Sequence, residues 1–334
     1  MIISVDLKEK SYNIFLKRNA LKEIDKYLNL SRKVLIVTDS GVPKEYAETV
    51  KEKCSQGHII TIPMGEESKN LNNFSSLLEE MCKLGFTRSD CVVAVGGGVV
   101  GDLAGFVAAS FMRGVDFYNI PTTVLSQVDS SIGGKVAIDF AGFKNIVGAF
   151  YQPKAVVIDP ETLKTLPSRQ ISNGLAEALK MSLTSDKDLF ELIEKEDIEN
   201  NIDLIIEKSL RIKKAVVEED EKEAGLRKIL NFGHTIGHAI EVNSEYELYH
   251  GECVALGMIP MCNDDIKPRV LKTLEKLNLP ITHNFSADEL ADAIKHDKKM
   301  SGDKITVVFV ENIGEFSMKT YEYNEFINIL KGEK

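Results

Sequence analysis

The segment from Cys91 to Met112 restricts the possible folds of this chain more than any other. Its sequence, CVVAVGGGVVGDLAGFVAASFM, carries a single charge, that of Asp102, and it is long enough to span a bilayer. Three consecutive glycines and an aspartate would destabilise a membrane-spanning helix. A buried strand, a glycine turn and a buried helix explain the same residues better. The segment therefore predicts an α/β protein rather than a membrane protein.

The same alternation of strand and helix runs through the first half of the chain. Strands are predicted at residues 33–39, 58–63, 91–98, 115–121 and 154–160, and helices at residues 44–54, 72–85 and 99–111. Strands that alternate with helices form a mostly parallel sheet covered on both faces, and ligands bind beyond the carboxyl ends of its strands. We therefore expect a Rossmann-like α/β domain over residues 1–167.

The second half of the chain has helical periodicity instead. Helices are predicted at residues 171–183, 189–194, 202–217, 226–242, 252–261 and 268–277, and a late pair of strands at residues 304–310 and 314–320 precedes a final helix. We expect a mainly α-helical domain over residues 168–334.

Charge and cysteine content narrow the class of protein. The net charge of −10 argues against non-specific binding of nucleic acid. The five cysteines have no CxxC spacing, which argues against a disulfide framework and against a cysteine-ligated zinc. The first residues, MIISVDLKEKSYNIF, do not resemble a signal peptide. We expect a cytoplasmic protein whose partners are small molecules, not nucleic acids or membranes.

A histidine-rich stretch, Leu230–Glu252, indicates a metal site. If residues 226–242 form one helix, Arg227, Asn231, His234 and His238 fall on one narrow stripe at 100° per residue. A solvent-exposed polar face would explain this stripe, but the neighbouring residues are small or apolar, and buried histidines need partners or a metal. The motif HTIGH lacks the glutamate of HExxH, so the metalloprotease interpretation fails.

The remaining metal ligand would come from another segment. Two histidines and a carboxylate suit a catalytic zinc with one position open to substrate. Glu177 is a candidate carboxylate, although Lys180, three residues later, makes an ordinary helical ion pair an alternative. Gly96–Asp102 follows a strand and opens a helix, so its backbone N–H groups could bind a pyrophosphate. A close-packed turn is the alternative there.

Several segments together resemble the 3-dehydroquinate synthase family. They appear in family order over roughly residues 35–300, and they are GEESK, GGGVVGDLAGFVAASFMRG, PTTVLSQVDSSIGGK, GFKNIVGAFYQP, LPSRQISNGLAEALK, DEKEAGLRKILNFGHTIGHAIE and YHGECVALGM. This combination is far more specific than any one motif.

The resemblance implies an activity in the shikimate pathway of aromatic amino-acid biosynthesis. The substrate would be 3-deoxy-arabino-heptulosonate 7-phosphate, and the products 3-dehydroquinate and phosphate. NAD would oxidise the substrate transiently, phosphate would leave by elimination, and re-reduction and an intramolecular aldol step would close the ring. Zinc, or cobalt in its place, would lower the pKa of a substrate hydroxyl.

The resemblance also implies the site residues. The metal ligands would be Glu177, His234 and His250. The NAD-binding residues would be Asp39, Glu66, Lys69, Gly97, Gly98, Val99, Asp102, Thr122, Thr123, Asp129, Lys135 and Lys144. The catalytic and substrate-binding residues would be Lys135, Lys144, Asn145, Lys180, Lys213, Glu223, Arg227, Asn231 and His238, joined by Lys298 or Lys299. Arg113 would reach into the site of a partner subunit in a homodimer, although a helix cap is its simpler interpretation.

The chain departs from the family pattern at Gln170, at Met181 and Ser182, and in a shortened segment after Met258. Two other activities remain open: another sugar-phosphate cyclase, and a polyol or glycerol-phosphate dehydrogenase of the same fold, which would release NADH.

Overall fold

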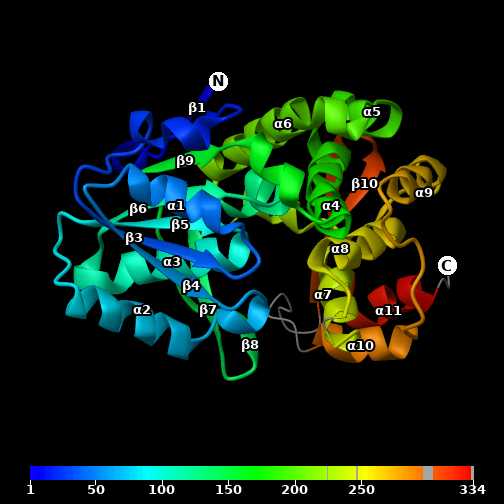
Figure 1. Cartoon of the computed structure of the whole chain (residues 1–334). Coiled ribbons are helices and arrows are strands. Elements are labelled where there is room, and N and C mark those ends of the chain that lie inside the picture. Colours follow the sequence, from blue (N-terminus) through cyan, green and yellow to red (C-terminus); the bar gives the residue numbers. More distant parts are fainter. Residues whose placement is uncertain (224, 246, 296–303, 332–334) are drawn as a thin grey trace. The chain divides into compact units, whose positions relative to one another are not determined.

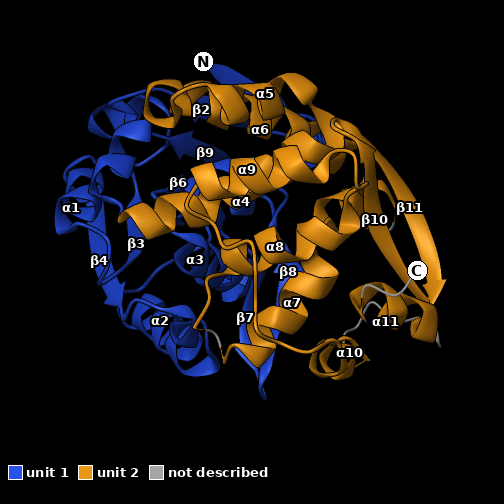
Figure 2. Cartoon of the chain, turned by 90° about the vertical axis from the view of Figure 1, so that its right-hand side faces the viewer, with its two compact units in different colours: residues 1–166 blue, residues 167–334 orange. Residues whose placement is uncertain are grey.

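The computed structural model describes residues 1–223, 225–245, 247–295 and 304–331 (Figure 1). The chain divides into two compact units, unit 1 (Met1–Leu166) and unit 2 (Pro167–Lys334) (Figure 2). Unit 1 is built on a mostly parallel sheet, and unit 2 is mainly helical. The predicted fold class is therefore confirmed.

Seven strands form the sheet of unit 1, in the order β1-β2-β9-β6-β5-β3-β4. They are β1 (Ile2–Val5), β2 (Tyr12–Leu16), β3 (Lys33–Asp39), β4 (Gln56–Ile62), β5 (Cys91–Gly96), β6 (Asp116–Pro121) and β9 (Ala155–Ile158). β1 and β2 pair antiparallel, and every other neighbouring pair is parallel. All six residues of β5 are buried, as its central place in the sheet requires. The sequence did not predict β1 or β2.

Three α-helices of unit 1 connect the parallel strands: α1 (Lys44–Glu52), α2 (Leu71–Lys83) and α3 (Gly98–Ser110). α3 is the apolar helix of the opening segment, and it packs against β5 and β6. α2 is amphipathic: it buries Leu77 and Met81, and the Asn70 side chain caps it by accepting the N–H of Asn73. At their carboxyl ends, β3 is thus followed by α1, β5 by α3, and β6 by the segment after Pro121.

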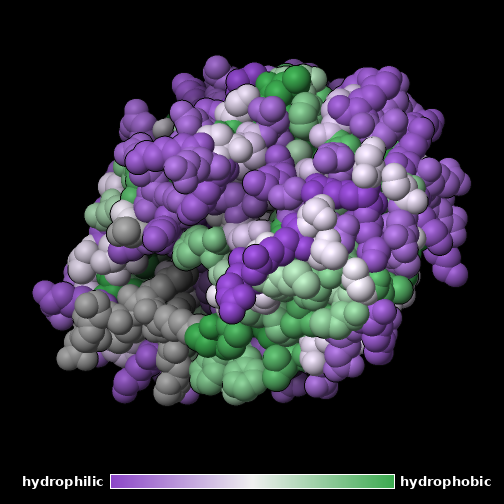
Figure 3. Space-filling model, turned by 90° about the vertical axis from the view of Figure 1, so that its left-hand side faces the viewer, coloured by the Kyte–Doolittle hydropathy of each residue, from purple (hydrophilic) through white to green (hydrophobic). Residues whose placement is uncertain are grey.

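A hairpin outside the main sheet, which the sequence did not predict, joins β7 (Lys135–Phe140) to β8 (Phe143–Phe150). Its turn residues Ala141 and Gly142 have φ values of 52° and 82°, typical of a two-residue hairpin turn. β8 is exposed along nearly its whole length. Figure 3 shows one face of the molecule, on which hydrophilic side chains predominate and hydrophobic ones gather mainly toward the bottom.

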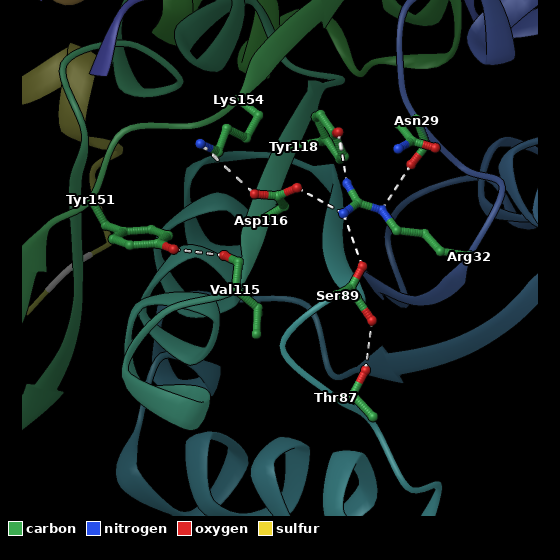
Figure 4. A network of polar contacts seen from close by, with 9 residues as sticks. All are labelled: Asn29, Arg32, Thr87, Ser89, Val115, Asp116, Tyr118, Tyr151 and Lys154. Carbon is green, nitrogen blue, oxygen red and sulfur yellow. Dashed lines mark hydrogen bonds and ion pairs between the residues drawn. The ribbon is translucent and has the colours of Figure 1, made fainter. Parts of the chain in front are cut away.

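A polar network ties the amino ends of the parallel strands together (Figure 4). The Arg32 guanidinium, directly before β3, donates to Asp116 Oδ2 at 2.7 Å and to the Tyr118 hydroxyl at 2.8 Å, both on β6. It also donates to the Ser89 carbonyl, before β5, at 3.1 Å. The Arg32 side chain is largely buried, so these bonds are worth more than those of an exposed ion pair. The network fixes the sheet at the edge opposite the carboxyl ends of its strands.

Unit 2 contains helices and one further hairpin. Its helices are α4 (Ser168–Ser185), α5 (Lys187–Lys195), α6 (Ile198–Glu219), α7 (His234–Asn243), α8 (His250–Met258), α9 (Lys267–Lys276), α10 (Ala287–Lys295) and α11 (Tyr323–Lys331), and its strands are β10 (Lys304–Asn312) and β11 (Glu315–Glu322). α8 packs against both α4 and α7. Among the residues that the structure describes, no helix is long and apolar enough to cross a membrane.

Candidate active site

Helix α4 carries a buried carboxylate and a buried ammonium on one face. Glu177 is 1% exposed and Lys180 is 2% exposed, although both are charged residues in the middle of the helix. The Lys180 Nζ atom makes a close ion pair with Glu177 Oε2. Burying two charges costs free energy that an ion pair recovers only in part, so the pair is poor evidence for a purely stabilising role.

The histidine-bearing segment is not the single helix that the sequence predicted. A short 3-10 helix (Leu226–Asn231) is followed by Phe232 as its C-cap, and Gly233 turns the chain with a φ of 76° before α7 begins at His234. A side chain at position 233 would lie 2.8 Å from the Val254 carbonyl oxygen of α8, so glycine also permits close packing there. The predicted stripe that joined Arg227 and Asn231 to the histidines is therefore wrong.

The break makes His234 the first residue of α7, and His250 is likewise the first residue of α8. Both rings approach the buried carboxylate of α4. Glu177 Oε1 lies 3.8 Å from His234 Nε2 and 3.5 Å from His250 Nε2. Two Zn–N bonds and one Zn–O bond of about 2.1 Å in tetrahedral geometry would set such atoms about 3.4 Å apart. Glu177, His234 and His250 thus form a trio whose atoms and spacing suit a zinc ion.

His238 lies beside this trio and not in it. Its ring centroid is 5.4 Å from that of His234 and 6.0 Å from that of His250. It forms a second group with Glu241 and His250, in which one potential ligand atom from each lies within 4.8 Å of the others. Burial alone would lower the pKa of His250, but Glu177 and Glu241 outweigh burial and raise this pKa to about 9.

Other predicted substrate residues of unit 2 lie on neighbouring elements. Lys213 is buried on α6, and Arg227 is 1% exposed. The Arg227 guanidinium donates to the Glu221 carbonyl at 2.5 Å, and Asn231 donates to Glu223 Oε1 at 2.8 Å. Such buried cations are costly unless they meet anions. Lys298 and Lys299 lie outside the described residues.

Unit 1 brings several of the predicted NAD-binding residues together. Lys69, 3% exposed, lies 2.8 Å from Glu66 Oε1 and 3.2 Å from Asp102 Oδ2. Burial raises the pKa of Asp102 to about 6 even though Lys69 opposes it. Burial would lower the pKa of Lys69, but the charges of Asp102 and Glu66 raise it above its usual value. Asp139, which the sequence did not single out, donates its backbone N–H to the Lys69 carbonyl at 2.7 Å.

The glycine turn after β5 closely approaches the segment after β6. A side chain at Gly97 would lie 3.1 Å from Thr123 Cγ2, and one at Gly98 would lie 3.2 Å from Ser130 Oγ. Gly97 is the N-cap of α3, so the first backbone N–H groups of that helix are near the hydroxyl-rich segment. Val99 lies in the first turn of the same helix.

The remaining predicted residues of unit 1 are spread over several elements. Asp39 ends β3, Thr122 and Thr123 follow β6, Asp129 lies in a short π-helix (Ser126–Ser130), and Lys135, Lys144 and Asn145 lie on the β7–β8 hairpin. Asn145 donates its backbone N–H to Asp139 Oδ1 at 2.8 Å, and that bond connects the hairpin strands. Arg113 is exposed, and with its neighbours Met112 and Gly114 it has a positive φ.

Comparison with known proteins identifies the family. The 3-dehydroquinate synthase N-terminal model matches residues 59–173, and the 3-dehydroquinate synthase C-terminal model matches residues 174–300. The chain is 42% identical to the 3-dehydroquinate synthase of Acetivibrio thermocellus, with 97% of each chain covered. The chain belongs to the 3-dehydroquinate synthase family. The same family name applies to a relative from Thermoanaerobacter pseudethanolicus, 43% identical over 98% of this chain and 99% of that protein.

Solved structures similar to this member of the 3-dehydroquinate synthase family include other cyclases. A 2-deoxy-scyllo-inosose synthase complexed with carbaglucose-6-phosphate, NAD+ and Co2+ has a TM-score of 0.90, 26% identity and full coverage of both chains. The 2-epi-5-epi-valiolone synthase of Streptomyces hygroscopicus subsp. jinggangensis 5008, with NAD+ and Zn2+ bound, has a TM-score of 0.88, 26% identity and 98% coverage of both chains. A glycerol dehydrogenase, at 16% identity and a TM-score of 0.58, shares the fold alone.

Proposed function

We propose that this protein converts 3-deoxy-arabino-heptulosonate 7-phosphate into 3-dehydroquinate and phosphate, with NAD and zinc or cobalt as cofactors. The observation that carries the proposal is the trio Glu177, His234 and His250, of which Glu177 and His234 are buried and His250 is half-buried. Lys180 is paired to its carboxylate, in a chain 42% identical to a 3-dehydroquinate synthase over nearly its whole length. Relatives at this identity are named for that one reaction.

The metal would be held by the trio. Two imidazole nitrogens and one carboxylate oxygen are the donor set of a catalytic zinc that keeps a position open for substrate. The three ligands come from α4, α7 and α8, so the site forms only when these helices pack. Lys180 offsets the negative charge of Glu177, and its ammonium group would bind an anionic group of a substrate held at the metal.

NAD would be held by unit 1, at the carboxyl ends of β3, β5 and β6. The support is the glycine N-terminus of α3, where a pyrophosphate is stabilised, beside the threonines that follow β6. Asp39, at the end of β3, stands where such folds bind a ribose. We also assign Lys69 and Asp102 to the cofactor site, where their ion pair holds both side chains in place.

The substrate would be held by basic and amide side chains. Its carboxylate and phosphate require cations, and Lys180, Lys213 and Arg227 are buried cations in unit 2. His238 and Asn231 would bind hydroxyl groups, and Lys144 and Asn145 on the hairpin would complete the set.

In this reaction the metal would lower the pKa of a substrate hydroxyl, and NAD would take up one hydride and return it. The protein's own residues keep one substrate in successive reactive geometries. Lys180 and Arg227 hold its charges, and His238 is positioned to accept or donate a proton at a hydroxyl. Residues 1–167 would therefore hold the cofactor, with Lys144 and Asn145 contributing to the substrate, and residues 168–334 would hold the metal and the other substrate-binding side chains.

We also propose a homodimer in which Arg113 serves the partner's site. Arg113 is exposed in a backbone turn of positive φ, next to Met112, which is 43% exposed. Gly114 lies against the Tyr151 hydroxyl, directly after Phe150, which ends β8 and is 43% exposed. Exposed apolar groups around a cation are typical of a protein interface. The cytoplasm is the proposed compartment, in keeping with the free cysteines of the described chain.

The experiment supplies the purified protein with the heptulosonate phosphate, NAD and zinc. We expect phosphate and 3-dehydroquinate to form in equal amounts, with many turnovers per NAD and no accumulation of NADH. His250→Ala serves as the inactive control. Accumulation of NADH in step with product would favour a dehydrogenase, and turnover of a different sugar phosphate alone would favour another cyclase.

Subunit complementation tests the role of Arg113. Arg113→Ala and Lys180→Ala should each be folded, dimeric and nearly inactive, whereas Arg88→Ala, at another exposed arginine of unit 1, should be active. In an exchanged equal mixture, half of the dimers are mixed and each has one intact site, so about a quarter of wild-type activity should return. Mixed dimers without activity would contradict the cross-subunit role.

A further inference from the structure

Glu241 is a buried carboxylate of α7 to which neither sequence nor family has given a role in this chain. It is 9% exposed and lies one turn after His238. Its Oε2 atom is 3.7 Å from Nδ1 of His250. The other ring nitrogen of His250, Nε2, faces Glu177 at 3.5 Å. The two nitrogens of one imidazole therefore face two different carboxylates.

The second histidine of the trio shows the same arrangement with a different acceptor. His234 Nδ1 lies 3.1 Å from the Phe232 carbonyl oxygen, while its Nε2 faces Glu177. A carbonyl oxygen can only accept, so this contact requires the proton on Nδ1 and leaves the lone pair on Nε2. A metal ligand needs this tautomer, because the lone pair forms the bond to the metal.

We propose that Glu241 is the positioning residue of His250: it accepts the Nδ1–H and so directs the Nε2 lone pair of that ring toward Glu177. The inference rests on the proposed metal-binding function of Glu177, His234 and His250. The separation of 3.7 Å exceeds a hydrogen bond, and a side-chain rotation that moves the oxygen by about 0.7 Å closes it. Glu241 and His250 lie on the packed helices α7 and α8, so the contact also connects these helices.

A second cation is the rival explanation, because His238, Glu241 and His250 could also surround an ion. Both groups share His250, however. One ring could bind two ions only as an imidazolate that has lost both N–H protons, whereas a carboxylate at Nδ1 needs only the neutral ring. The positioning role therefore needs only a neutral His250 ring, whereas a second cation would need the ring to lose both protons.

The test measures the zinc affinity and stoichiometry of the whole protein by competition with a chromophoric chelator. Glu241→Ala should bind zinc about 10- to 100-fold more weakly than wild type, with a stoichiometry of one in both. Glu241→Gln should lie between them, because its amide oxygen still accepts the Nδ1–H. The control is Asn243→Ala, on the same helix as Glu241. It removes the hydrogen bond from the Asn243 side chain to the Ala239 carbonyl, and it should bind zinc like wild type.

Three outcomes would overturn the inference. Unchanged affinity in folded Glu241→Ala, or an affinity of Glu241→Gln lower than that of Glu241→Ala, would exclude the positioning role. A fall in stoichiometry from two to one would identify a second metal site instead. Loss of affinity in Asn243→Ala as large as that of the Glu241 variants would indicate general disruption of α7. Wild-type protein that binds no zinc would instead contradict the proposed function, so the two failures are distinguishable.

Discussion

Substitution of Gly257 tests whether the packing of α7 on α8 sets the metal geometry. A Cβ atom at this position would lie 2.0 Å from the Gly233 carbonyl oxygen and 2.7 Å from the Gly237 nitrogen. Ordinary contact requires the shorter distance to lengthen by roughly 1.4 Å. Both neighbours are backbone atoms, so no side-chain rotation relieves the overlap. We expect Gly257→Ala to separate α7 from α8.

Two effects of the substitution oppose each other. Alanine is the better helix former by up to about 1 kcal/mol, which alone would stabilise the protein. Overpacking in a well-packed interior costs typically about 1–3 kcal/mol, and an overlap with rigid backbone lies at the upper end. The steric overlap therefore outweighs the gain in helix propensity, and the free energy of unfolding should fall by about 1–3 kcal/mol. Zinc affinity should fall as well, because metal–ligand distances tolerate only about 0.2 Å.

Urea unfolding and chelator competition measure the two effects. The matched control is Leu256→Ala on the same helix, which removes buried atoms and adds none. It should lose about 2–5 kcal/mol of stability but keep zinc affinity near that of wild type. A Gly257→Ala protein as stable as wild type, or one that loses no more zinc affinity than Leu256→Ala does, would contradict this role of the α7–α8 packing.

Three further predictions concern other residues. Burial alone would raise the pKa of Glu252, but Arg169 and a backbone N–H outweigh burial and hold this pKa below its usual value of 4.5. Arg169→Gln should therefore lower the free energy of unfolding, measured in urea at pH 7, by about 1–3 kcal/mol. This difference from wild type should shrink as the pH falls through the depressed pKa, because Glu252 is then protonated. A constant difference would contradict it. A thiol reagent should modify exposed Cys82 first in the native protein, as peptide mapping would show; early labelling of a buried cysteine would exclude this order. Metal analysis should find no tight zinc in His250→Ala and nearly full zinc in His238→Ala, and equal loss would contradict the assignment.

The sequence predicted the helices and strands that can be recognised from their own pattern of apolar residues. The strand and helix of residues 91–112 are recognisable because continuous apolar runs flank a glycine turn. The 3-10 break at Gly233 was missed because apolar and histidine spacing continues through it. The left-handed turn there depends on the approach of α8, which is tertiary information. The β7–β8 hairpin was missed too, because its turn residues Ala141 and Gly142 are not one of the usual pairs, such as Asn-Gly, that signal a two-residue turn.

The candidate site was accessible to sequence reasoning only in part. Helical spacing drew attention to His234 and His238, but His238 lies beside the trio and not in it. Glu177 was a candidate ligand, with an ordinary ion pair to Lys180 as the alternative, until the resemblance singled it out. Glu241 carried no signal of its own, because an isolated glutamate on an amphipathic helix is normally a surface residue. Its relation to His250 depends on the packing of two helices.

His234 and His250 each stand at the first position of a helix, with consequences for the charge that the trio can stabilise. The amino end of a helix carries a partial positive charge, and side chains of the first turn point back toward it. Two helix amino ends therefore face the trio, and each would weaken the binding of a bare cation there by about 0.3–1 kcal/mol. The same field favours an anion bound beside that cation. The arrangement would therefore lower the affinity of the trio for a metal ion and would stabilise a negatively charged group bound beside that ion.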